Sequence, residues 1–199
     1  MNFIDLVAQT RTCRRFRQSA SVSPLVVRGL VDLGRLAACA GNLQPLKYVL
    51  STSPAKNSAI FPHLRWAAYF RDWAGPEEGE RPAAYIVVCR DNTISDTPGS
   101  DHGFATQNIL LGATDCGLGA CPIGSIDRDG LRRVLDVPEY CEILLVIALG
   151  YPAETVQLEK VFSDRSIRYW RDPAGVHHVP KRSLEEIILL EFTEPPGVA

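Results

Sequence analysis

The feature that most constrains the fold is a long helical pattern over residues 100–117, which opens at Ser100, a residue type that can cap a helix. The apolar residues between positions 105 and 113 suggest burial on more than one face of this helix. Two strand-sized apolar runs flank it in the chain, at residues 83–90 and 142–149. We therefore expect a long buried helix that packs against a small sheet.

Shorter patterns place the other elements around this centre. Ser23-Pro24 and Ser53-Pro54 each combine a preferred helix cap with a proline that the first helical turn tolerates. Ser183 and Glu186 fit a capping box. The prediction is an α+β fold in which helices wrap a small sheet. It includes helices at residues 2–9, 25–40, 63–73, 127–135 and 184–190, a short helix after Ser53-Pro54, and a strand at residues 48–51.

Length and charge exclude several classes of protein. The chain has 199 residues, which favours a single domain, here expected over residues 1–192 with a tail at 193–199. Its 21 basic and 23 acidic residues nearly balance, whereas a nucleic-acid-binding domain usually carries a basic excess. The longest apolar run, residues 143–149, is far shorter than the ~18 residues of a membrane-spanning helix. No secretory signal is visible at the N-terminus, so we expect a cytoplasmic protein without nucleic-acid or membrane partners.

The six cysteines also favour the cytoplasm. No Cys-x-x-Cys pair occurs, and disulfide frameworks belong to short secreted chains. Cys116 and Cys121, with His177 and His178, offer a weak alternative as a zinc site, because structural zinc sites favour tight cysteine pairs. We expect no metal.

Two basic segments could meet an anion. Residues 11–16 crowd three arginines and Thr12 into six positions, and the forked donors of arginine match phosphate oxygens. Residues 177–182 end in Lys181 and Arg182, which could reach an anion at the start of the following helix. The alternative for each is a charged surface segment in contact with solvent.

Two further segments could meet a planar ligand. Asn42 and Gln44, within residues 40–45, carry amides that pair with a ring of donors and acceptors, although an ordinary helix end is the alternative. Residues 117–125 are rich in glycine, which permits close approach of the backbone to a ligand. They contain neither a dinucleotide-binding nor a phosphate-loop motif, and a loop that simply needs turns is the alternative.

Each segment is a weak signal alone, but their order resembles the nitroreductase-like FMN flavoprotein family. Arg11-Thr12-Cys13-Arg14-Arg15-Phe16 is similar to the family's Arg-Ser-x-Arg-x-Phe, with Thr in place of Ser. Asn42-Leu43-Gln44-Pro45 keeps its Asn-x-Gln-Pro, while the preceding Pro-Ser is lost. Residues 101–111 look like its central helix, and residues 66–70 and 79–85 look like a short-chain branch. The resemblance extends to about Leu190.

The resemblance implies a nitroreductase-like fold, with a small, mainly antiparallel sheet wrapped by helices, and a domain-entwined homodimer with FMN sites at the subunit interface. By residue match, the basic residues of both charged segments would hold the phosphate and ribityl end of FMN. Asn42 and Gln44 would lie near the flavin ring. The phosphate and ribityl set is Arg11, Thr12, Arg14, Lys181 and Arg182.

The same match places Pro122, Ile123, Gly124 and Ser125 where the family presents a backbone N–H to flavin N5. Nitroreductases proper often carry Glu-Gly at this position, where this chain has Gly124-Ser125. A side-chain role there does not follow from the resemblance, whereas the backbone contact does not depend on the side chain.

The function that the resemblance implies is an FMN-dependent NAD(P)H oxidoreductase. Hydride would pass from NAD(P)H through flavin N5 to a small electrophilic acceptor, such as a nitroaromatic or a quinone, in ping-pong fashion. No catalytic side chain is needed, because the flavin carries the chemistry. Trp66, Tyr69 and Phe70 could form an aromatic wall for the acceptor, or could serve packing alone.

Two alternatives stay open at this point. One is a flavin-binding module without NAD(P)H turnover. The other is a redox enzyme that uses Cys13, Cys39 or Cys121, since the arginines beside Cys13 would lower the pKa of its thiol.

Overall fold

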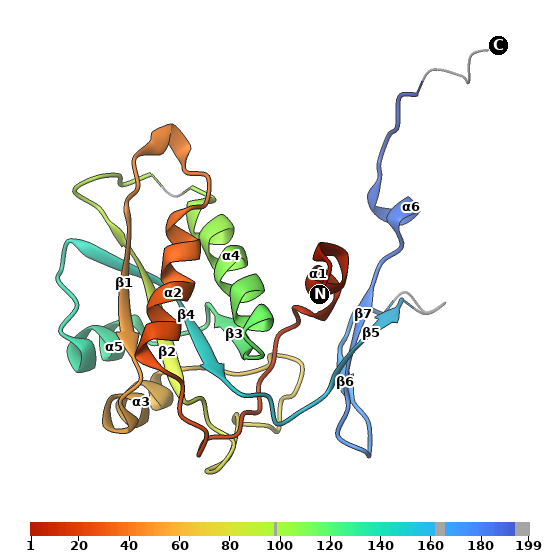
Figure 1. Cartoon of the computed structure of the whole chain (residues 1–199), viewed down its shortest axis with the longest axis horizontal. Helices are drawn as coiled ribbons and strands as arrows, with labels where there is room; N and C mark the ends of the chain where they lie inside the picture. The colour runs from red at the N-terminus through yellow and green to blue at the C-terminus, as the bar shows by residue number, and fades with distance from the viewer. Residues whose placement is uncertain (98, 162–165, 194–199) are drawn as a thin grey trace. The chain divides into compact units, whose positions relative to one another are not determined.

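The computed structural model describes residues 1–97, 99–161 and 166–193 and contains two compact units, residues 1–154 and 155–199 (Figure 1). From residue 194 onward, the tail expected at 193–199 lies outside the described residues. No helix among the described residues is long and apolar enough to cross a membrane.

The first unit is built on a four-stranded sheet with the order β1-β2-β4-β3, in which every neighbouring pair is antiparallel. Strands β2 (Ala84–Asp91) and β4 (Cys141–Gly150) form its centre. They correspond to the two predicted apolar runs, whose continuous apolar character suits a strand buried on both faces. The edge strands are β1 (Leu46–Ser51) and β3 (Gly119–Ile123). The predicted α+β fold with a small antiparallel sheet is therefore confirmed.

Helices α2 (Pro24–Arg35) and α4 (Asp101–Asp115) lie together against one face of this sheet (Figure 1). Leu30 of α2 and Ile109 of α4 are fully buried in a cluster with the apolar side chains of the central strands. This packing fixes the first turn of α4 beside the chain that follows α2, which matters for the site below.

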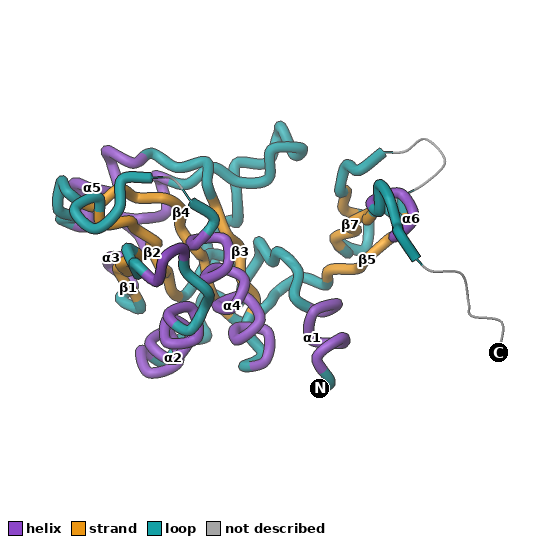
Figure 2. Tube along the Cα trace, turned by 90° about the horizontal axis from the view of Figure 1, so that it is seen from above, coloured by secondary structure: helices purple, strands orange, loops and turns teal. Residues whose placement is uncertain are grey.

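The opposite face is covered by α3 (Pro54–Ile60), the short 3-10 helix η2 (Phe61–His63) and α5 (Arg128–Leu135). Figure 2 shows α5 on the side of the strands away from α2 and α4. A side chain caps the start of α3 and of α5. Ser53 accepts a hydrogen bond from the amide of Lys56, and Asp127 accepts one from the amide of Gly130. The cap predicted at Ser53 is confirmed.

Two short elements complete the first unit. Helix α1 (Phe3–Gln9) matches the first predicted helix, starts at an Asn2 cap, and buries none of its residues within the chain. The 3-10 helix η1 (Ala40–Asn42) contains Gly41 at a positive φ of 56°.

The second unit holds a three-stranded sheet with the order β5-β7-β6. Strand β7 (His177–Lys181) pairs in parallel with β5 (Val156–Lys160) and antiparallel with β6 (Trp170–Arg171). Helix α6 (Leu184–Ile187) follows, and Ser183 caps it by accepting from the amide of Glu186.

Several local predictions are wrong. The helix expected at 25–40 ends at Arg35, because Cys39 and Ala40 bond to Asp101 and not to the preceding turn. The last helix ends at residue 187 and not at 190. Residues 64–73 form turns and not a helix, since Trp66 inserts into the core and Ala67 takes a positive φ.

Further differences concern the glycine-rich segment, residues 177–181 and the long helix. Residues 119–123 form a strand, so the alternative of a plain loop does not hold there, and residues 177–181 also form a strand. The buried residues of α4 lie on one face within the chain, while Phe104 on its other side is 53% exposed. Ser100 precedes α4, but its side chain makes no capping hydrogen bond.

Candidate functional site

The first unit brings two of the predicted segments together, the basic segment at 11–14 and the glycine-rich strand β3. Thr12 forms an isolated parallel bridge with Ala120, and the amide of Cys13 donates to the Ala120 carbonyl at 2.9 Å. Gly119 permits this approach, because a Cβ there would lie 2.8 Å from both the Cβ and the Sγ of Cys13. Main-chain pairing therefore holds the basic segment along the edge of the sheet.

Arg11 follows α1 and carries a buried donor without a partner. One guanidinium nitrogen, Nη2, donates to the Val7 carbonyl at 2.7 Å. Its Nε is buried and has no hydrogen-bond partner among the described residues. Burial lowers the pKa of Arg11 from its ordinary value, since the low-dielectric surroundings disfavour the charged form. An anion beside Arg11 would satisfy this donor and compensate the charge.

Glu154 adds a carboxylate to the basic segment that no sequence pattern indicates. Its Oε1 accepts the main-chain amide of Arg15 at 3.1 Å, and that of Arg14 at a shorter distance. The segment is thus ordered from two sides, by Ala120 through main chain and by Glu154 through a side chain. A lone glutamate about 140 positions away in the chain could not be assigned to this place without the fold.

The end of β3 presents residues of different exposure. Ile123 is buried in the core, Pro122 is half-buried, and Gly124 and Ser125 are exposed. The ladder with β4 ends at Ile123, and a Cβ built on Gly124 would meet nothing within 4 Å. The main chain at Gly124 is therefore open to a ligand, while Ser125 is tied by its carbonyl to the amide of Arg65 at 3.0 Å.

The amide segment lies in the loop after α2. Asn42 and Gln44 are both exposed, and each has a φ of +53°, a conformation that non-glycine residues adopt at a cost in free energy. The Nε2 of Gln44 donates to the Asn42 carbonyl at 3.2 Å. Backbone strain of this kind concentrates at binding and catalytic sites.

Two cavities flank this loop. The larger, of about 350 Å³, is lined by Gly41, Leu43 and Asp101 together with residues of β2 and β4, and the smaller, of about 220 Å³, by Cys39, Gln44 and Asp101 with residues of α2 and β1. The larger volume lies within the range typical of small-molecule sites, and the smaller lies just below it.

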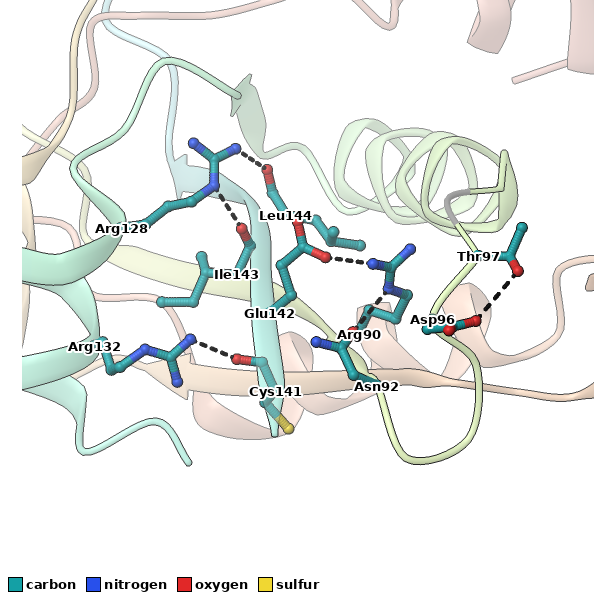
Figure 3. Close-up of polar contacts among 10 residues, drawn as sticks. All are labelled: Arg90, Asn92, Asp96, Thr97, Arg128, Arg132, Cys141, Glu142, Ile143 and Leu144. Carbon is teal, nitrogen blue, oxygen red and sulfur yellow. Dashed lines mark hydrogen bonds and ion pairs between the residues drawn. The ribbon is translucent and has the colours of Figure 1, made fainter. Parts of the chain in front are cut away.

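The wall of the larger cavity formed by β2 and β4 is held by ion pairs and arginine contacts (Figure 3). Arg90 pairs with Glu142 of the neighbouring strand and donates to Asn92 at 3.1 Å. On the other side of β4, Arg128 donates to the Ile143 carbonyl at 2.9 Å. These contacts fix the first half of β4, so this wall is a rigid part of the site.

Lys181 and Arg182 belong to the second unit. Lys181 is the exposed last residue of β7, and its carbonyl accepts the amide of Val161 at 3.1 Å. Arg182 pairs with Glu186 one helical turn later. Both side chains are presented at the junction of a strand and a helix, as the capping-box pattern indicated.

The aromatic segment divides into a buried and an exposed part. Trp66 is only 7% exposed and packs against Phe61 with ring centroids 5.9 Å apart, so its ring belongs to the core. Tyr69 is 45% exposed, and Phe70 meets Trp73 edge-on. Any aromatic wall from this segment therefore consists of Tyr69 and Phe70.

Two of the cysteines considered for redox chemistry, Cys13 and Cys121, are poorly suited to a nucleophilic role. Burial raises the pKa of Cys13 to about 12, and the nearby charge of Glu154 adds to the effect. The expectation that flanking arginines lower the pKa of Cys13 is therefore wrong, because desolvation outweighs them. Burial likewise raises the pKa of Cys121 to about 12. All six cysteines are free, and no group of three or more metal-ligating side chains forms among the described residues.

A model of the nitroreductase family matches residues 7–151, which include the basic segment, the loop that carries Asn42 and Gln44, and β3. The chain belongs to the nitroreductase family. It is therefore an oxidoreductase enzyme. A relative from Methanothermobacter thermautotrophicus, named "Putative NADH dehydrogenase/NAD(P)H nitroreductase", is 28% identical over 184 residues, with 89% of this chain and 86% of that protein covered.

Solved structures share the family's fold. A nitroreductase family protein from Streptococcus pneumoniae superimposes with a TM-score of 0.68 at 19% identity, over 96% of this chain and 100% of that one. The NADPH:FMN oxidoreductase of Vibrio harveyi, solved in complex with NAD⁺, gives a TM-score of 0.58 at 23% identity, over 75% and 68% of the two chains. These similarities confirm the nitroreductase fold predicted from the sequence.

Proposed function

We propose that this member of the family is an FMN-dependent NAD(P)H oxidoreductase that passes electrons, in ping-pong fashion, to a small electrophilic acceptor such as a quinone or a nitroaromatic. The observation that carries the proposal is the buried Nε of Arg11, which has no partner among the described residues and lies on the segment paired with β3. A buried cationic donor of this kind fits a phosphate. The name of the Vibrio harveyi structure, which includes FMN, is consistent with it.

The phosphate and ribityl end of FMN would be held by cations and a hydroxyl of the basic segment. Arg11 offers its Nε, and Thr12 and Arg14 follow on a main chain that Ala120 and Glu154 keep ordered. By residue match to the family, Lys181 and Arg182 are two further cations proposed for the phosphate. FMN carries nearly two negative charges on its phosphate, so several cations suit it.

The ring of FMN would meet polar groups on the first unit. Asn42 and Gln44 supply exposed amides that match a ring edge with both donors and acceptors. Pro122, Ile123, Gly124 and Ser125 supply the end of β3, where the open space at Gly124 lets a planar group approach the main chain.

When bound, FMN supplies two-electron chemistry at N5, which alternates between NAD(P)H and the acceptor. The chain's part is to bind, to orient, and to place main-chain donors where negative charge develops. No side chain need act as a nucleophile or general base. Tyr69 and Phe70 remain the candidates for contact with the acceptor, whereas Trp66 stays in the core.

Exposed apolar side chains support the homodimer. Phe3 and Ile4 of α1 are 68% and 79% exposed, and Phe104 of α4 is 53% exposed. In the second unit, Leu189 and Phe192 are about 90% exposed. Apolar surface of this extent usually marks an interface, and two-fold closure is the commonest arrangement. The free cysteines agree with a cytoplasmic location.

Anaerobic reduction tests the reaction. The FMN-loaded protein is mixed with NADH or NADPH, and a quinone or a nitroaromatic is then added. We expect the flavin absorption to bleach with at least one nucleotide and to return with the acceptor, with parallel double-reciprocal plots in the steady state. A protein that binds FMN but is bleached by neither nucleotide would instead be a flavin-binding module without turnover. A colourless protein whose redox activity ends on alkylation would favour a cysteine-based enzyme.

A further inference from the structure

The amide loop, defined here as residues 39–44, holds a strained conformation that main-chain hydrogen bonds support only in part. Gly41, Asn42 and Gln44 all have φ values between 53° and 56°. Within the loop, the amide of Asn42 donates to the Cys39 carbonyl at 3.0 Å and that of Leu43 to the Ala40 carbonyl at 3.2 Å, whereas the amides of Ala40 and Gln44 donate to side-chain atoms. A strained backbone of this kind persists only where the surrounding structure holds it in place.

Asp101, the first residue of α4, supplies that contact. Its Oδ1 accepts the main-chain amide of Ala40 at 3.1 Å, and its Oδ2 accepts the thiol of Cys39 at 3.0 Å. The Cys39 Sγ in turn accepts the main-chain amide of Gln44 at 3.1 Å. One carboxylate and one thiol thus close the loop from its first residue to its last.

The thiol is suited to this double role because it both donates and accepts. The hydrogen bond to Asp101 is the largest cause of a raised pKa at Cys39, so the sulfur keeps its proton at neutral pH. A protonated thiol donates to the carboxylate and accepts from the amide at the same time. This is the opposite of what a nucleophilic cysteine needs.

The position of the pair gives it a consequence for binding. Asp101 lines both cavities that flank the amide loop, so the start of α4 borders both of them. The side chains of Asn42 and Gln44 are exposed on this loop. Displacing the Cys39 sulfur would move the Gln44 main chain and, with it, the amides offered to a ring.

We infer that Asp101 and Cys39 are positioning residues, which hold the amide loop so that Asn42 and Gln44 meet the flavin ring. This inference rests on the proposed function for its flavin contact. Neither residue touches the cofactor in this account; Asp101 acts through Cys39, and Cys39 through the main chain of Gln44.

Three variants test the pair, with two controls of the same residue types at the opposite end of α4. Cys39→Ala removes the sulfur, Cys39→Ser keeps a smaller donor and acceptor, and Asp101→Asn keeps an acceptor but removes the charge. Cys116→Ser and Asp115→Asn change an exposed cysteine and an exposed aspartate at the far end of α4. FMN affinity is measured by fluorescence titration, alongside the visible spectrum and the melting temperature.

We expect Cys39→Ala and Asp101→Asn to weaken FMN binding by about tenfold, the effect of one lost hydrogen bond of ordinary strength, and to shift the flavin absorption bands. Cys39→Ser should recover most of the affinity, and both controls should match the wild type. A residue with only a structural role would lower the melting temperature without moving the bands or being rescued by serine.

A second readout needs no flavin. The rate of Cys39 alkylation by iodoacetamide is followed against pH in the apoprotein, with the labelled peptide resolved by mass spectrometry. We expect Asp101→Asn to move the profile to lower pH, because the carboxylate that raises the thiol pKa is neutralised. An unchanged profile would overturn the Asp101–Cys39 contact, even if Cys39→Ala fails to fold.

The two readouts separate this inference from the proposed function. If the wild type binds no FMN, the proposed function fails, and the flavin role of the pair fails with it, whatever the alkylation profile shows. If the wild type binds FMN and all three variants bind it equally well with unchanged spectra, the proposed function stands and the positioning role is overturned.

Discussion

The basic segment and the amide loop are held in place by different means. Main-chain bonds hold the basic segment, from Cys13 to Ala120 and from Ala153 to Arg15, each at 2.9 Å, and the Glu154 carboxylate adds bonds to two of its amides. The amide loop depends on two side chains, Asp101 and Cys39. Main-chain pairing tolerates substitution of the side chains it presents, whereas a loop held by side chains depends on those particular residues. The first region should therefore lose binding without losing shape, and the second should lose both together.

The largest expected effect is on the basic segment. Arg11→Ala removes the buried charged donor but leaves the main-chain bridge between Thr12 and Ala120 intact. We expect FMN affinity to fall about 10- to 100-fold, the range for a lost hydrogen bond to a charged group, with an unchanged melting temperature. Titration of apoprotein with FMN measures it. Arg28→Ala, at an exposed position of α2, is the control, and equal affinities for both variants would contradict the assignment.

The next largest effect is expected from disrupting the main-chain bridge between Thr12 and Ala120. Gly119→Ala would place a Cβ 2.8 Å from the Cβ of Cys13, so the basic segment must move off β3. We expect a loss of about 1–3 kcal/mol in the free energy of unfolding, typical of overpacking, together with weaker FMN binding. Urea denaturation gives the first quantity. Full stability in this variant would show that the bridge is not what orders the segment.

Gly124→Ala sharpens the same comparison at the other end of β3. A Cβ there meets nothing within 4 Å, so the free energy of unfolding should stay within about 0.5 kcal/mol of the wild type. FMN affinity should still fall several-fold, because the added methyl group would obstruct the approach of a planar ring to the main chain. Comparing urea midpoints and FMN titrations for this variant and Gly119→Ala tests this. Unchanged FMN affinity would remove Gly124 from the site.

The smallest expected effect concerns the second unit, where protonated His178 stabilises the three-stranded sheet. His178 of β7 bonds to Glu159 of β5 at 2.8 Å and to Asp172 after β6 at 3.2 Å, and stacks on Trp170. These bonds, that to Glu159 first, raise the pKa of His178, and the bond to His178 is the main cause of a lowered pKa at Asp172.

The pH dependence of the stability of this sheet follows from the directions of these two pKa shifts. The stability from protonated His178 is fully present below its unfolded pKa of about 6.5 and is lost as pH rises through the higher folded value. That from Asp172 is present above its unfolded pKa and is lost as pH falls through the lower folded value. The opening free energy of β7, obtained from amide exchange after correction for the intrinsic pH dependence of exchange, should thus be largest in mildly acidic solution, and His178→Gln should flatten its decline at higher pH. A pH-independent opening free energy for β7, derived from that exchange, would contradict this account.

The sequence predicted the parts of the fold that local physics determines. Continuous apolar runs indicated β2 and β4, and the cap at Ser53 indicated α3. The prediction failed where tertiary contacts decide the structure. Pro122 and the three glycines of residues 117–125 made β3 resemble a loop, and the burial of Trp66 prevents a helix at 63–73.

The site shows the same division. The residues that would touch FMN carry recognisable chemistry in a recognisable order, and the resemblance could name them. Asp101 and Glu154 could not be found, because a single carboxylate has no pattern, and its importance comes from where the fold delivers it. Likewise, nothing in the sequence shows that Thr12 lies beside Ala120.

The most direct test of the central claim is the visible absorption spectrum of the purified protein before and after addition of FMN. The account predicts flavin bands in the protein as isolated, or uptake by the apoprotein to one FMN per chain. A colourless protein that takes up no FMN would contradict it, and would mean that the basic segment, the amide loop and the end of β3 do not form a flavin site.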